Sequence, residues 1–90
     1  MQETYISTAC AVDQQGRPHT FHYYLLSQQV QSGSFFCEDL GIAIHEEGGT
    51  TVRIPGITPN RTRLEQLMTM LIRNAATPLN LPEIVEDWLA

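Results

Sequence analysis

Apolar and polar residues alternate through much of the first half of the chain. Residues 4–12 and 19–26 are rich in β-branched, small and aromatic residues, a composition typical of strands. The intervening segment DQQGR (residues 13–17) predicts a three-residue hairpin loop with Gly16 in the left-handed conformation. Such a loop pairs Asp13 with Arg17. The register then opposes Cys10 with Thr20, Ala9 with Phe21 and Ile6 with Tyr24.

A second hairpin is predicted after residues 27–34, which read as a polar loop that pivots at Gly33. Residues 35–46 place Leu40, Ile42 and Ile44 on one face, and residues 50–54 place Val52 and Ile54 on one face. A two-residue turn at Gly48-Gly49 would oppose Ile44 with Arg53, whereas a three-residue loop over 47–49 opposes Ile44 with Val52. Because a slip of one residue turns every side chain to the other face, we predict the three-residue loop. Pro55-Gly56 is expected to end the strand.

The second half of the chain has a helical period, with an apolar stripe formed by Leu64, Leu67, Met68, Leu71 and Ile72. Two helix starts compete. Thr58 can serve as N-cap with Pro59 as the first helical residue, or Thr62-x-x-Glu65 can form a capping box. We favour Thr58, because proline then occupies its preferred position. Pro78 limits this helix to about Asn74, and a short second helix is predicted from Asn80, with Trp88 packed inward.

The order ββββαα predicts a single α+β domain over residues 1–90. Its four-stranded antiparallel sheet is built from two hairpins, and the two C-terminal helices pack on one face. Both faces of the first hairpin are apolar, although two short helices can cover only one of them. The two faces carry, respectively, Tyr5, Ala9, Ala11, Phe21, Tyr23 and Leu25, and Ile6, Cys10, Val12, Tyr24 and Leu26.

The uncovered face must therefore be buried in another way. Either the sheet curls around its own core, or a partner covers the second face. We take Tyr5, Phe21, Tyr23 and Leu25 as the candidate interaction surface.

Charge and hydropathy narrow the classes of function. The 90 residues carry 10 Asp+Glu against 5 Lys+Arg, a net charge of −5, so the basic face that nucleic-acid binding needs is missing. No apolar run approaches the roughly 18–20 residues of a membrane span. The segment MQETYISTAC lacks the basic and apolar regions of a signal peptide. We expect a cytoplasmic protein without a membrane or nucleic-acid partner.

No set of residues has the spacing that catalysis or metal binding requires. His19 and His22 are three apart on a predicted strand and point to opposite faces, so they cannot share a metal ion. Cys10 and Cys37 have no neighbouring cation of the kind that activates a thiol. The acidic pairs 38–39, 46–47 and 86–87 diverge on strands and helices alike. We predict no catalytic residue, no cofactor and no metal.

Three hypotheses of function remain, in order of preference. The first is a protein–protein interaction or regulatory module that docks to a protein partner or to itself, as a homodimer through the first hairpin. The second is a small-ligand-binding protein or minor enzyme with a pocket between sheet and helices, using Tyr23 or Tyr24, His22 and Arg53. The third is an acidic decoy of nucleic acid or an inhibitor from a mobile element.

The segments FHYYLL, LGIAI, ITPN and TPLNLPEIVEDWL resemble those of a small uncharacterised family of Gram-positive anaerobic bacteria. The resemblance extends over nearly the whole chain, and the closing pattern TP-x-x-L-x-x-x-VEDWL is its most specific part. It implies a bacterial protein that consists of one domain of unknown function. It implies no activity, cofactor or catalytic residue.

Overall fold

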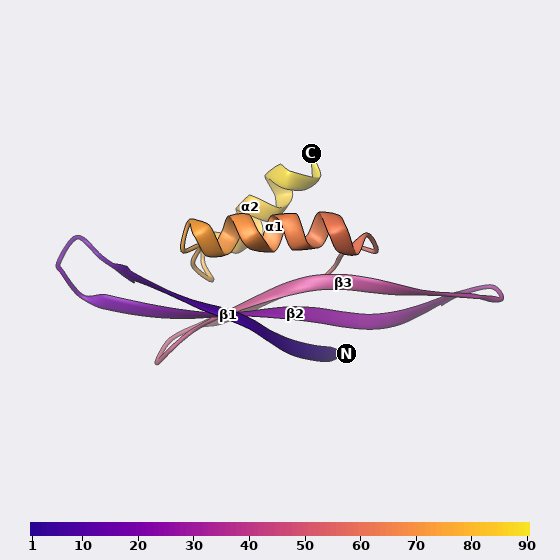
Figure 1. Ribbon diagram of the computed structural model, residues 1–90, viewed down its shortest axis with the longest axis horizontal. Coiled ribbons are helices and arrows are strands. Elements are labelled where there is room, and N and C mark those ends of the chain that lie inside the picture. The colour runs from indigo at the N-terminus through magenta and orange to yellow at the C-terminus, as the bar shows by residue number, and fades with distance from the viewer.

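Four strands are followed by two helices, and the computed structural model describes all of residues 1–90. The strands form one antiparallel sheet in the order β1-β2-β3-β4, and both helices lie on the same side of it (Figure 1). The predicted α+β fold with two C-terminal helices on one face is confirmed. The elements are β1 (Gln2–Val12), β2 (Pro18–Ser32), β3 (Phe35–Glu46), β4 (Thr51–Thr58), α1 (Arg61–Arg73) and α2 (Leu81–Leu89).

The first hairpin has the predicted loop but contains a bulge that the sequence did not indicate. The Asp13 amide donates to the carbonyl oxygen of Arg17 at 3.0 Å, and Gly16 has φ 78°. Cys10 pairs with Thr20 and Ala9 with Phe21, as predicted. The predicted pair Ile6–Tyr24 is wrong, because Tyr5 pairs with Tyr24 and Ser7 with Tyr23. Ile6 is the extra residue of a bulge. From Tyr5 to the N-terminal end of β1, each side chain therefore lies on the face opposite to the one that an unbroken register would give it.

The segment 27–34 is not a loop, contrary to our prediction. β2 continues to Ser32 and β3 begins at Phe35, so only Gly33 and Ser34 form the turn. Gly33 has φ 62°, which suits the first position of a two-residue hairpin turn. Polar residues continue the strand here because no part of the core faces them.

Beyond the helices, β2 and β3 continue as a two-stranded ribbon. β1 pairs with β2 no further than Ser27, and β4 pairs with β3 no further than Leu40. Residues 28–39 are therefore flanked by no other strand, and we call them the arm. Figure 1 shows the arm projecting from one end of the sheet, away from both helices.

The β3–β4 hairpin confirms the predicted three-residue loop, since Ile44 pairs with Val52 and Ile42 with Ile54. Pro55-Gly56 does not end the strand, as we had expected. β4 bulges there instead and pairs again at Thr58, which lies opposite Leu40. The bulge brings the β4 backbone against Gly41. A Cβ on Gly41 would overlap the carbonyl oxygen of Ile54 and lie 2.6 Å from Pro55 Cα.

The core lies between the helices and the middle of the sheet. From the sheet it contains Phe21, Tyr23, Leu25, Leu40, Ile42 and Ile44, and from α1 the stripe Leu64, Leu67, Met68 and Leu71. Tyr23 is fully buried and its hydroxyl donates to the Ala76 carbonyl oxygen at 2.8 Å. Burial raises the pKa of this phenol to about 12. The hydrogen bond fastens the link between the two helices to the centre of β2.

Neither of the two helix starts weighed for α1 is used. Asn60 is the N-cap and its Oδ1 accepts from the Arg63 amide at 3.1 Å, while Thr58 Oγ1 accepts from the Asn60 amide. Pro59 therefore precedes the helix, which ends before Asn74 as predicted.

The second helix also begins as predicted, immediately after Asn80. Its tryptophan lies at the margin of the core rather than deep in it. Trp88 is half-buried, and the Arg63 guanidinium lies 4.7 Å from the centroid of its ring.

The close approach of β4 makes Gly41 the glycine whose substitution should cost the most. We expect Gly41→Ala to lower the free energy of unfolding by about 1–3 kcal/mol, because the backbone of β4 must move to admit a methyl group. Gly49→Ala is the matched control, since its Cβ would meet only the flexible side chain of Glu46. Urea unfolding of both variants measures the difference, and equal losses would contradict the assignment.

Candidate functional site

The four residues predicted to form an interaction surface are separated by the fold. Phe21, Tyr23 and Leu25 belong to the core and are 2%, 0% and 8% exposed beneath the helices. Tyr5 is 56% exposed and, because of the bulge, shares the opposite face with Tyr24. The folded chain therefore does not present these four side chains as one surface.

The uncovered face of the sheet satisfies its own polar groups. One residue from each strand forms a row across it: Thr8, His22, His45 and Thr51. Thr8 Oγ1 lies 2.9 Å from His22 Nδ1, and His45 Nδ1 lies 2.6 Å from Thr51 Oγ1. The two imidazole rings stack with centroids 6.0 Å apart.

Two apolar side chains of the same face are covered within the chain. Leu26 and Ala43 have side chains on this face, and each is 1% exposed. This face is therefore mixed, with a polar row and buried apolar residues beside the exposed side chains of Tyr5 and Val12.

Of the residues considered for a ligand pocket, Tyr24 and Arg53 line a common hollow but His22 and Tyr23 do not. Tyr23 faces the core and its hydroxyl is already bonded, whereas His22, Tyr24 and Arg53 lie on the uncovered face. A depression of about 300 Å³ there is lined by Tyr24 and Arg53, but Glu3 forms an ion pair with Arg53.

His19 and His22 lie on opposite faces of β2, as their spacing predicts. Across all 90 residues, no three His, Cys, Asp or Glu side chains are grouped so that they could hold a metal ion. His19 instead connects the β1–β2 loop with the end of β3. Its Nε2 donates to Asp13 Oδ2 at 2.9 Å, and its Nδ1 lies 3.5 Å from Glu46 Oε2.

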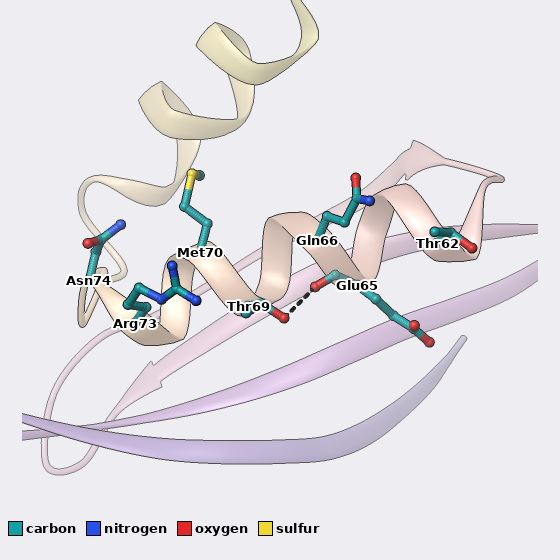
Figure 2. A pocket seen from close by; sticks show the side chains of 7 residues that line it. All are labelled: Thr62, Glu65, Gln66, Thr69, Met70, Arg73 and Asn74. Carbon is teal, nitrogen blue, oxygen red and sulfur yellow. Dashed lines mark hydrogen bonds between the residues drawn. The ribbon is translucent and has the colours of Figure 1, made fainter.

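A hollow of about 570 Å³ lies along the outer surface of α1 and is lined by Thr62, Glu65, Gln66, Thr69, Met70, Arg73 and Asn74. Figure 2 shows that these side chains leave the helix in different directions. The one hydrogen bond that a side chain makes among them runs from Thr69 Oγ1 to the Glu65 carbonyl oxygen at 2.9 Å. Divergent side chains on an open helix surface form no site.

The arm carries the most exposed aromatic side chains of the molecule. Phe35 is 76% exposed, Phe36 68% and Val30 39%, and the stretch VQSGSFFC (residues 30–37) contains no charge. Both outer edges of the ribbon present unpaired backbone groups. Proteins usually protect such edges with charges, proline or a covering element, and an isolated two-stranded ribbon is marginally stable in water. The arm is therefore the candidate functional site.

The base of the arm is fixed to the rest of the fold. Glu38 accepts hydrogen bonds from Ser27 Oγ at 2.9 Å and from Arg61 Nη2 at 3.2 Å. The bond from Ser27, and then that from Arg61, lower the pKa of the Glu38 carboxyl. Because Arg61 opens α1, this contact links the base of the arm to the helix layer.

Our reading of the sequence missed this site, because it assigned residues 27–34 to a loop. The available signal was the uncharged run around a Ser-Gly-Ser turn, followed immediately by two phenylalanines. Such a run is long enough for a hairpin. Because it lacks the alternation of apolar and polar residues that marks a core strand, it indicates a hairpin outside the core.

The fold and the arm define a class: an α+β protein whose central hairpin extends beyond the helices and exposes an apolar tip. A family model described as "Family of unknown function (DUF6514)" matches residues 2–90, and the chain belongs to this family. This confirms the expected membership of an uncharacterised family. No curated protein and no solved structure matches the chain significantly.

Neither helix has the length and apolar content of a membrane span.

The contacts of His19 predict a pH dependence of stability. The hydrogen bond with Asp13, supported by Glu46, raises the pKa of His19 above its ordinary value of 6.5, and the same bond lowers the pKa of Asp13 below 3.8. The contribution of His19 to stability is complete below pH 6.5 and is lost as pH rises through its raised pKa. That of Asp13 is complete above pH 3.8 and is lost as pH falls through its lowered pKa.

An NMR titration of the histidine side chains tests this contact. We expect Asp13→Asn to move the pKa of His19 towards 6.5 and to reduce the fall in urea midpoint above neutral pH. Glu47→Gln is the control, because Glu47 lies beside His22 rather than His19. An unchanged His19 titration in Asp13→Asn would show that the contact does not form in solution.

Proposed function

We propose that this protein is a protein–protein interaction module of the bacterial cytoplasm, and that the arm is its binding element. The observation that carries the proposal is the exposure of Phe35 and Phe36 on an uncharged ribbon with two unpaired edges. Aromatic residues are enriched among the side chains that dominate binding energy in protein interfaces. Exposed strand edges supply main-chain hydrogen bonds to a partner.

The area of the exposed rings indicates what kind of contact the arm makes. Phe35 and Phe36 are consecutive in β3, so their rings stand on opposite faces of the ribbon, and each offers about 150–250 Å² if it buries fully. A specific interface buries about 800 Å² on each partner. The arm therefore supplies the anchor of an interface, and neighbouring surface completes it.

The cellular setting is supported by the cysteines and by the sequence resemblance. Cys10 and Cys37 are both exposed and unpaired, as is usual in a reducing compartment. The resemblance to a family of Gram-positive anaerobes points to bacteria. No particular observation favours a ligand-binding or enzymatic function, because three of the side chains named for it are bonded elsewhere: Tyr23 to the Ala76 carbonyl, His22 to Thr8 and Arg53 to Glu3.

Site-specific photo-crosslinking in living cells tests the proposal. We expect Phe35→p-benzoylphenylalanine to give discrete covalent adducts with protein. Leu79→p-benzoylphenylalanine is the matched control, because Leu79 is 82% exposed but lies in the link between the helices, outside the arm. If position 35 gives no adduct, or the same adducts as position 79, the arm is not a protein-binding element.

A further inference from the structure

We infer that the arm docks to a second copy of this chain, in the apolar groove between β1 and α1, and that two copies exchange arms reciprocally. This inference rests on the proposed function of the arm and names its partner. Two features of the molecule support it. The arm is an apolar projection that packs on nothing in its own chain, and the groove is an apolar recess that its own chain leaves open.

The recess is a groove of about 340 Å³ beside the free edge of β1. Its apolar lining comes from both layers: Ile6, Leu25, Leu64, Met68 and Ile72. The bulge in β1 accounts for its shape, since it turns Ile6 towards the helices while Tyr5 stays on the other face. Ile6 is 43% exposed, so the groove is open to solvent in the single chain.

The edge of β1 next to this groove is suited to strand addition. β1 is the first strand of the sheet and pairs only with β2, so its outer main-chain groups are free. Between Thr4 and Val12 the edge carries no charge. A strand laid along it would direct alternate side chains into the groove, in the mode by which extended segments are recognised at sheet edges. Both outer edges contain a bulge, but the β4 edge is less suitable because Pro55 has no main-chain N–H to donate.

The charge distribution limits where two copies of this chain can meet. The chain carries a net charge of −5, so two copies repel one another over most of their surface. The arm from Val30 to Cys37 and the β1 edge from Thr4 to Val12 carry no charge, and the two charged residues that line the groove, Arg61 and Glu65, have opposite signs, so copies can meet there without bringing like charges together. The groove also has room for a phenylalanine ring, whose full burial gives the largest gain available to the arm.

The arm cannot fill the groove of its own chain. It projects away from the helices, and Arg61 and Ser27 hold its base through Glu38 (Figure 1). Docking therefore has to occur between chains. If each copy gives one arm and receives one, the contact closes on itself as a two-fold dimer. Two arm–groove contacts, each with main-chain pairing along β1, then approach the area of a specific interface.

The test uses sedimentation equilibrium of the full chain and two double variants. The arm variant is Phe35→Ser with Phe36→Ser, and the groove variant is Ile6→Ser with Thr69→Glu, because Thr69 is an exposed residue at the rim. We expect the native chain to form a dimer and each variant to weaken it by about thirtyfold or more. Met70→Ser with Leu79→Ser, which alters exposed residues elsewhere, should dimerise like the native chain.

Mixing the two variants gives the decisive measurement. The groove variant keeps an intact arm and the arm variant keeps an intact groove, so an equimolar mixture restores one of the two contacts. We expect a heterodimer in the mixture that is tighter than either homodimer and weaker than the native dimer. Far-ultraviolet circular dichroism confirms that each variant is folded.

Each other outcome has a defined meaning. A monomeric native chain, a groove variant that dimerises normally, or a mixture that stays monomeric overturns the arm–groove dimer. The proposed function survives those results if position 35 still crosslinks to a different protein. An arm variant that dimerises normally, together with no crosslinking from position 35, removes both proposals.

Discussion

A mismatch in length between α1 and β2 governs the shape of this protein. A helix of 13 residues is about 20 Å long, whereas a strand of 15 residues is about 50 Å long. The stripe on α1 can therefore cover less than half of β2, and the buried residues of β2 and β3 fall within that covered part. What extends beyond the helix has no layer to pack on, so the arm follows directly from the two lengths. The molecule's longest dimension, 54 Å, reflects the strands rather than the core.

The sequence predicted the part of the fold in which side chains alternate against a core. The Ile42–Ile54 and Ile44–Val52 pairs followed from the pattern alone, because a shift of one residue would have exposed the apolar set. The stripe of α1 was predicted for the same reason. Residues 27–34 were misassigned because Ser and Gln carry no alternation when neither face is buried. Backbone hydrogen bonds place most of these residues in strands, and such bonds cannot be read from the pattern of side chains.

Bulges account for the errors of detail. An extra residue at Ile6 and the irregularity opposite Gly41 each change which side chain faces the helices, yet neither alters composition. The candidate surface of Tyr5, Phe21, Tyr23 and Leu25 assumed an unbroken register through β1. It also assumed that the helices would not cover the β2 residues. The second assumption failed because the face that they cover is the one that carries Phe21, Tyr23 and Leu25.

Because no core residue lies within the arm, evolution can treat the arm and the packed body as separate modules. Adding or removing a residue from each strand of the ribbon would change its reach without opening a cavity beneath α1. Substitutions near Gly33 would likewise alter what the tip recognises at little cost to folding. Members of such a family can therefore diversify in arm length and tip chemistry on a constant scaffold. The hairpin then acts as a variable region held by a fixed frame.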